Sequence, residues 1–147
     1  MSLRYRMGLQ WTASVCAALV LLGGCGASNR GASKTPPLAV TERDFHISTS
    51  TTQASAGDVT LRVDNRGPDQ HELLVVPARS TSLPIRSDGF TVDEEALQSY
   101  ETGSLEPGQP GRTRDLTLHL SPGRYVLFCN MEGHYMAGMH TILVVTP

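Results

Sequence analysis

The chain has few aromatic residues, few cysteines and no excess of basic charge. Phenylalanine, tyrosine and tryptophan make up 5% of its 147 residues, whereas there are 14 glycines and 9 prolines. This composition favours short strands joined by turns over long helices, and the length is typical of a single domain. The formal net charge is −2, so the chain lacks the basic excess of nucleic-acid-binding proteins and we expect no nucleic-acid partner.

The N-terminal apolar stretch is too short to span a bilayer stably. Ala13–Leu22 follows a basic start and has about ten residues, whereas a membrane-spanning helix needs about 20. It leads into Leu22-Gly-Gly-Cys25, which resembles a bacterial lipoprotein signal, in which small residues precede the cysteine that receives the lipid. We therefore predict a signal peptide over residues 1–24 and lipidation of Cys25. An ordinary cleaved signal peptide and an uncleaved anchor are the alternatives.

Residues 25–37 are small and polar and end in two prolines, which is typical of a flexible tether. A lipid on Cys25 would hold the following domain at the extracytoplasmic face of a bacterial membrane, as in a periplasmic lipoprotein. Cys16 would be lost with the signal peptide, which leaves only Cys25 and Cys129. Because each of these two has a better role than pairing with the other, we expect no disulfide.

Residues 38–147 are predicted to form one all-β domain. Three segments alternate apolar and polar residues with the period of half-buried strands: Asp44–Ser48, Val59–Val63 and Leu116–Ser121. Three continuous runs of apolar, β-prone residues predict further strands: Leu73–Val76, Tyr125–Phe128 and Thr141–Val145. His46 and His119 fall on the polar side of the alternating segments, so we interpret both as surface residues.

One long segment, Pro77–Gly111, is irregular and contains several Pro and Gly turn signals. Within it, Thr91–Leu97 begins with capping residues and has acids in its first turn, which predicts a short helix. Together the elements predict a Greek-key β-sandwich with one short helix in a long inter-strand excursion.

The loop between the last two predicted strands carries Cys129, His134 and Met139 at equal spacing, C-x4-H-x4-M. A thiolate, an imidazole and a thioether on one short loop suit a soft, redox-active metal, above all copper. A His₂Cys site with a weak axial methionine needs one more histidine. His71 lies where a loop enters the predicted strand Leu73–Val76, so it is the candidate for that ligand.

With this ordered set the sequence resembles the cupredoxins, the type 1 (blue) copper proteins such as plastocyanin, azurin and rusticyanin. The resemblance covers roughly Leu38–Pro147 and includes the segments Gly57–Gly67 and Leu120–Cys129. It implies a cupredoxin-like sandwich that binds one Cu(I)/Cu(II) ion. The implied ligands are the Cys129 thiolate, the two imidazoles of His71 and His134, and the thioether of Met139 as a long axial ligand.

Two features of the loop bear on these assignments. Met131 and Met136 also lie near the site, but Met139 has the rusticyanin-like spacing, and Gly138 before it gives the chain freedom to turn the thioether inward. Glu72 stands where plastocyanin and azurin have asparagine. We hypothesise that Asn130 hydrogen-bonds Glu72 and joins the two ligand-bearing segments. Backbone N–H groups are expected to point at the cysteine sulfur.

The resemblance implies a membrane-tethered carrier of single electrons. In the family, electrons leave through the exposed edge of the second histidine across a small apolar patch. We therefore expect redox protein partners to dock near His134, on a surface formed with Met131, Tyr135 and Met136. We also expect the protein to be a monomer.

Other functions are less well supported by the residues. An extracytoplasmic copper chaperone or copper-storage protein is the alternative, but a closed set of four ligands favours holding the metal. We expect no enzyme activity, because the loop lacks the second cysteine of a binuclear copper site and Cys129 lacks the flanking histidines of a multicopper oxidase. A domain of this fold that has lost its metal is disfavoured because all four ligands are present.

Overall fold

The computed structural model describes residues 35–80 and 82–147. The predicted signal peptide (1–24), the predicted lipidation site Cys25 and most of the predicted tether lie outside the described residues. Within the described part, no helix is both long enough and apolar enough to pass through a membrane.

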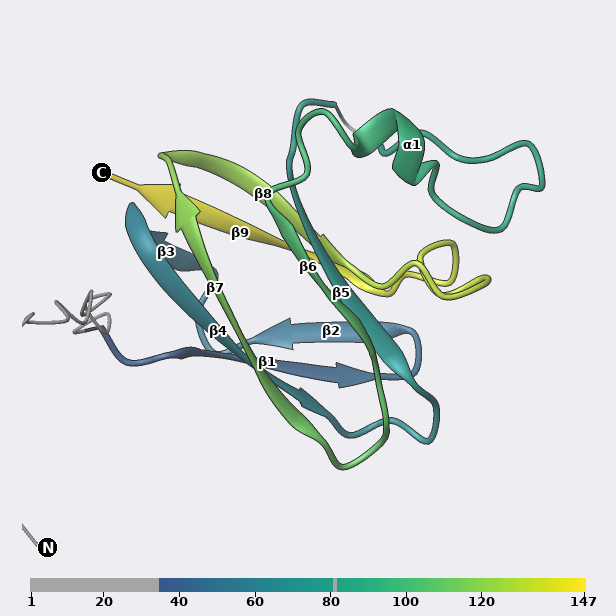
Figure 1. Cartoon of the computed structure of the whole chain (residues 1–147), viewed down its shortest axis with the longest axis horizontal. Helices are drawn as coiled ribbons and strands as arrows, with labels where there is room; N and C mark the ends of the chain where they lie inside the picture. The colour runs from purple at the N-terminus through teal and green to yellow at the C-terminus, as the bar shows by residue number, and fades with distance from the viewer. Residues whose placement is uncertain (1–34, 81) are drawn as a thin grey trace, which may run out of the picture. The chain divides into compact units, whose positions relative to one another are not determined.

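The described residues form short strands and one short helix, as the composition predicted (Figure 1). The elements are β1 (Leu38–Arg43), β2 (His46–Thr49), β3 (Gln53–Ser55), β4 (Gly57–Asn65), β5 (His71–Pro77), α1 (Glu94–Leu97), β6 (Gly103–Gly108), β7 (Thr113–Leu120), β8 (Gly123–Phe128) and β9 (His140–Thr146).

The strands form two sheets that face each other (Figure 1). One has the order β2-β1-β4-β7 and the other the order β3-β9-β8-β5-β6. Most neighbours are antiparallel, but β1 runs parallel to β4 and β3 runs parallel to β9. The prediction of an all-β sandwich with one short helix in a long excursion is confirmed.

The burial of β5 and β8 explains why their sequences are continuous apolar runs. Leu73 and Val75 of β5 belong to the main core cluster, whereas Leu74 and Val76 belong to a second cluster under the excursion. β8 divides in the same way, with Tyr125 and Leu127 in the first cluster and its alternate residues in the second. A strand that is covered on both faces has no polar side, so it loses the alternation that half-buried strands keep.

The excursion between β5 and β6 covers the second cluster through α1. Asp93 caps this helix, its Oδ1 accepting from the N–H of Ala96 at 3.3 Å, and Leu97 is fully buried. The predicted helix is thus confirmed near its expected position, although it is shorter than Thr91–Leu97. Leu97 attaches the excursion to the sheet because its apolar area is removed from water.

Two parts of the strand prediction are wrong. The segment Asp44–Ser48 is interrupted, because the chain reverses at Asp44 and Phe45 and pairs Arg43 with His46. Ile47 is 2% exposed as expected, but Phe45 lies in the turn and is 51% exposed. The other error is an omission, because the apolar patterns predicted no strand at β1, β3 or β6. β3 and β6 are edge strands, and at an edge the Pro and Gly residues of β6 are tolerated.

Candidate metal centre

The loop between β8 and β9 is closed by its own backbone. The N–H of Cys129 donates to the carbonyl of Met139 at 3.1 Å, and the N–H of Met139 donates to the carbonyl of His134 at 3.0 Å. Gly133 and Gly138 have φ angles of 78° and 103°, a region that residues with a side chain rarely adopt. The glycines therefore let eleven consecutive residues, 129–139, fold back on themselves between two paired strands.

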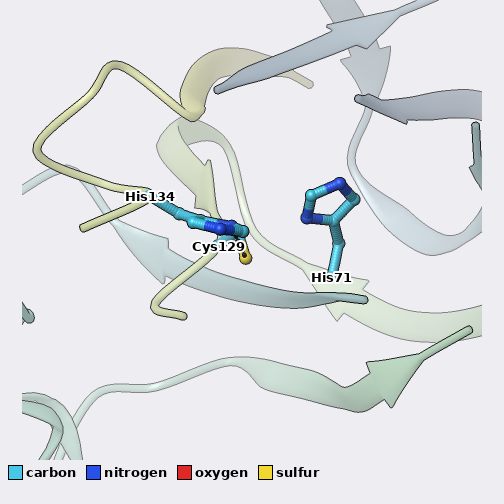
Figure 2. A group of neighbouring side chains, drawn as sticks. All are labelled: His71, Cys129 and His134. Atoms are coloured by element: carbon cyan, nitrogen blue, oxygen red, sulfur yellow. Dashed lines mark hydrogen bonds between the residues drawn. The ribbon is translucent and has the colours of Figure 1, made fainter. Parts of the chain in front are cut away.

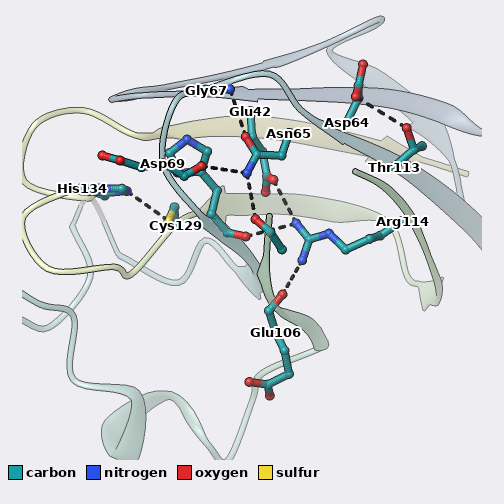
Figure 3. Close-up of polar contacts among 12 residues, drawn as sticks. Glu42, Asp64, Asn65, Gly67, Asp69, Glu106, Thr113, Arg114, Cys129 and His134 are labelled. Carbon is teal, nitrogen blue, oxygen red and sulfur yellow. Dashed lines mark hydrogen bonds and ion pairs between the residues drawn. The ribbon is translucent and has the colours of Figure 1, made fainter. Parts of the chain in front are cut away.

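A buried amide holds the segment that carries His71. The Asn65 side chain donates to the carbonyls of Asp69 (2.9 Å) and Gly108 (2.8 Å) and accepts from the N–H of Gly67 (2.9 Å; Figure 3). These three bonds use both N–H donors and one of the two acceptor positions of a side chain that is 0% exposed. Asn65 thus fixes the path of the chain just before His71 begins β5.

The structure brings three of the predicted ligands together (Figure 2). The candidate ligand atoms of His71, Cys129 and His134 all lie within 4.8 Å of one another, and all three residues are buried. The Cys129 sulfur lies 3.4 Å from Nδ1 of His134, and the two imidazole centroids are 5.2 Å apart. The three side chains come from two segments that are far apart in the sequence.

The methionines differ in burial. Met139 is fully buried and belongs to the same core cluster as Cys129, whereas Met136 is 54% exposed. Met131 is partly buried against that cluster. The burial of Met139 agrees with an inward thioether after Gly138, while its role as axial ligand stays a prediction.

Burial favours the protonated form of the Cys129 thiol in the metal-free protein. Burial raises its pKa to about 11, and the backbone N–H groups of Glu72 and Met131 oppose this rise by hydrogen bonding to the sulfur. These two groups are the N–H donors that the resemblance implied. A metal ion would have to displace the thiol proton, after which the same N–H groups would stabilise the thiolate.

The surroundings of His71 favour the neutral form of its imidazole, which is the form that binds a metal cation. Its pKa is lowered, first by burial and then by the neighbouring His134. Its Nδ1 is buried and has no hydrogen-bond partner among the described residues. An unpaired buried nitrogen is costly unless a ligand satisfies it. Together with a thiol, a second imidazole and a buried thioether, this nitrogen fits a soft transition metal such as copper.

A buried ion pair lies behind His71. Nη2 of Arg114 is 3.0 Å from Oε2 of Glu42 and also donates to the carbonyl of His71 at 3.1 Å, and Nη1 donates to the carbonyl of Glu106 (Figure 3). Burial raises the pKa of Glu42 to about 7, although Arg114 opposes the rise. Arg114 has room because residue 108 is glycine, where a Cβ would lie 2.5 Å from the guanidinium.

The hypothesis that joined Asn130 to Glu72 is correct for the backbone and wrong for the side chain. The N–H of Asn130 donates to Oε1 of Glu72 at 3.1 Å. Its side chain instead pairs with both backbone groups of Val92, at 2.6 and 3.1 Å, and donates to Glu94 at 2.6 Å. Asn130 therefore joins three parts of the molecule: the two ligand-bearing segments and the excursion.

The surface near His134 differs from the prediction. His134 is only 9% exposed, and the ring of Phe45 meets it edge-on with centroids 5.5 Å apart. Tyr135 turns inward and packs on Phe128 of the second cluster. Among the described residues, the sequence analysis assigned no functional role to Phe45, Asn65 or Arg114. Phe45 was expected on the apolar face of a strand, whereas the turn between β1 and β2 places its ring against His134.

The fold is shared with solved cupredoxins. A dithionite-reduced auracyanin from the photosynthetic bacterium Roseiflexus castenholzii matches with a TM-score of 0.53 and 18% identity, over 74% of this chain and 95% of that chain. Auracyanin B matches with a TM-score of 0.54 and 23% identity, over 79% of this chain and 94% of that chain. An azurin (Az-iso2) from the obligate methylotroph Methylomonas sp. strain J matches with a TM-score of 0.53 and 16% identity, over 74% of this chain and 96% of that chain. No protein-family model and no curated protein sequence matches the chain.

Proposed function

We propose that the protein is a blue copper protein that carries single electrons between redox partners while tethered to a membrane. The observation that carries this proposal is the buried group of His71, Cys129 and His134, with ligand atoms within 4.8 Å of one another in a cupredoxin fold. Met139 is proposed as the axial ligand, since it is fully buried beside the cysteine. We propose a carrier and not an enzyme.

The chain's contribution is to hold the donor atoms still and to keep water away. Bound copper would supply one-electron chemistry between Cu(II) and Cu(I). Cys129 and His134 are held by the closed β8–β9 loop, and His71 is held by Asn65 and Arg114. Preorganised groups need not rearrange when the charge at the centre changes, so they lower the barrier to electron transfer.

Redox partners are proposed to dock on an apolar rim, defined here as Phe45, Phe90 and Met136. These side chains are 51%, 55% and 54% exposed. Phe45 touches His134, and the carbonyl of Phe90 accepts from the N–H of Gly133 at 3.2 Å, so both residues border the loop that carries Met136. Met136→Glu is expected to slow electron exchange with a physiological partner. Ser55→Glu should not, because Ser55 lies on β3 opposite Thr146, at the end of β9 that is remote from the ligand loop.

A visible absorption spectrum tests the copper site. The full chain in mild detergent is loaded with Cu(II), beside a Cys129→Ser variant. We expect an intense thiolate-to-copper band in the wild type and none in the variant. A colourless protein that binds only Cu(I) would contradict electron transfer and favour a copper chaperone or store.

The membrane tether is tested separately. Mass spectrometry of protein made in a bacterial host is expected to show a mature chain that begins at Cys25 and carries a diacylglycerol. Cys25→Ala should release the domain from the membrane fraction without changing its copper spectrum. A wild-type chain that retains residues 1–24 would contradict lipidation.

A further inference from the structure

The turn between β1 and β2 touches both histidines of the metal centre. Its two central residues are Asp44 and Phe45, between the paired residues Arg43 and His46. Phe45 contacts His134, as described above. Asp44 faces the other histidine, with its Oδ1 3.1 Å from Nε2 of His71.

The contact between Asp44 and His71 is closely enclosed. Oδ1 of Asp44 and Nε2 of His71 are both buried and lie within ion-pair distance, but not in hydrogen-bond geometry. Neither atom has a hydrogen-bond partner elsewhere in the described part of the chain. Residue 67 is glycine, where a Cβ would lie 2.4 Å from Nε2 and 2.7 Å from Oδ1. No larger residue fits there without separating the two groups, so Gly67 closes the space around them.

The chemistry of this pair determines which nitrogen of His71 carries the proton. An ionised carboxylate only accepts hydrogen bonds, so Nε2 must carry the proton in order to pair with it. The lone pair of the neutral ring then resides on Nδ1. Both ring nitrogens are buried without a hydrogen-bond partner among the described residues, but only Nε2 faces the carboxylate of Asp44. Figure 2 shows one nitrogen of the ring turned toward Cys129 and His134.

We propose that Asp44 is a positioning residue of the metal centre, whose carboxylate orients the His71 ring, fixes its tautomer and strengthens Nδ1 as a donor. This inference rests on the proposed copper site. It assigns a role to a side chain in a strand turn that lies 27 positions before the ligand it supports. A carboxylate on the far nitrogen of a metal-bound imidazole raises the basicity of the near one.

A simpler role for Asp44 would be local, because aspartate is common in turns, where its side chain bonds nearby backbone groups. The geometry disfavours this role. Oδ1, the buried oxygen of the carboxylate, has no backbone donor in hydrogen-bond geometry within the described residues, and it faces the imidazole of His71. A purely local role would leave the properties of the copper site unchanged when the charge is removed, which makes the two roles separable.

The main variant is Asp44→Asn, which keeps the shape and an acceptor oxygen but removes the charge. We expect Cu(II) binding to weaken about 10-fold, as for other partners of metal-bound histidines. Cu(I) binding should weaken less, because the lower charge depends less on donor strength. The ratio of the two affinities then changes by up to tenfold, so the reduction potential should rise by up to about 59 mV.

Asp58→Asn is the matched control. Asp58 also pairs with a histidine, Nδ1 of His119 at 2.9 Å, but both side chains are exposed, at 61% and 76%, on strands β4 and β7. This substitution should leave the potential and the Cu(II) affinity unchanged. Gly67→Ala would push Asp44 and His71 apart with its added methyl group. It should therefore shift the reduction potential in the same direction as Asp44→Asn.

A second readout needs no metal. In the metal-free protein, nitrogen NMR of the His71 ring should show Nε2 protonated in the wild type and a mixture of tautomers in Asp44→Ala. An unchanged potential in Asp44→Asn, or an unchanged tautomer in Asp44→Ala, would overturn the inference. If the wild type lacks a thiolate-to-copper band, the proposed function fails, while the NMR result still decides whether Asp44 positions His71.

Discussion

The two histidines of the metal centre are held in different ways. His134 lies in a loop whose backbone closes on itself, with its N–H donating to Met131 and its carbonyl accepting from Met139. His71 is surrounded by side chains from distant segments: Asp44 on its ring and Arg114 on its carbonyl. One ligand is therefore placed mainly by local structure and the other by the packing of the whole sandwich.

This difference explains why the two sides of the site should respond differently to mutation. Short-range backbone bonds survive most side-chain changes, because every residue except proline has both a backbone donor and a backbone acceptor. A ligand held by distant polar side chains loses its support when any one of them is removed. The following predictions test this comparison, beginning with the largest expected effect.

Arg114→Ala should be the most destabilising change on the His71 side. It leaves the carboxylate of Glu42, which is 0% exposed, without its partner. Breaking a buried ion pair in this way costs about 3–5 kcal/mol. Urea unfolding at pH 8 measures the loss. Arg62→Ala is the control, because its pair with Asp115 is exposed on both sides and should matter little.

The same carboxyl predicts a pH dependence. The pKa of Glu42 is raised from 4.5 to about 7 in the folded protein, so between these values the folded state binds more protons than the unfolded state. The contribution of Glu42 to the free energy of unfolding should therefore be fully present below pH 4.5 and fall as the pH rises toward 7. Glu42→Gln should remove this contribution, and the cost of Arg114→Ala should be smaller at pH 5 than at pH 8. Equal losses at both pH values would contradict the assignment.

Asn65→Ala should both destabilise the fold and disturb the metal site. It leaves the N–H of Gly67 and the carbonyls of Asp69 and Gly108 without their partner, a loss of roughly 2–4 kcal/mol. Because this segment leads into His71, Cu(II) affinity should fall as well. Thermal unfolding and metal titration measure the two effects. Stability lost without any loss of affinity would show that His71 is positioned independently of Asn65.

Asn130→Ala is the matched substitution on the His134 side. Asn130 is also buried, and its side chain makes three hydrogen bonds, but these go to Val92 and Glu94 in the excursion. We expect a loss of about 1–3 kcal/mol. The copper spectrum should hardly change, because the N–H that donates to Glu72 remains. A Cu(II) affinity that falls as much as in Asn65→Ala would contradict the distinction between the two sides.

The smallest expected effect concerns Phe45. Its φ of 61° is strained for a bulky residue, at a cost of order 1 kcal/mol that glycine would not pay. Phe45→Gly should therefore be more stable than Phe45→Ala by about 1 kcal/mol. Both variants should expose His134 to water. Chemical denaturation compares the two variants, and equal stabilities would show that the backbone is not strained.

Several features were predicted from the sequence because they depend on nearby residues. The strands around Leu61, Leu118 and Leu127 follow from apolar patterns, and the short helix follows from its capping residues. β3 and β6 were missed because edge strands are defined by their neighbours. The turn at Asp44 and Phe45 was missed because Phe45 continues the apolar alternation, and its φ of 61° is rare for a bulky residue.

The sequence by itself determined the fold class and the set of candidate ligands. Period-two alternation and short spacing on one loop are local properties, so Cys129, His134 and Met139 could be recognised together. Only the tertiary structure decided what surrounds them. The carboxylate of Asp44 on His71 and the guanidinium of Arg114 behind it come from segments that are distant in the chain, a turn and a strand. Contacts of this kind depend on sheet order and register, which no local pattern encodes.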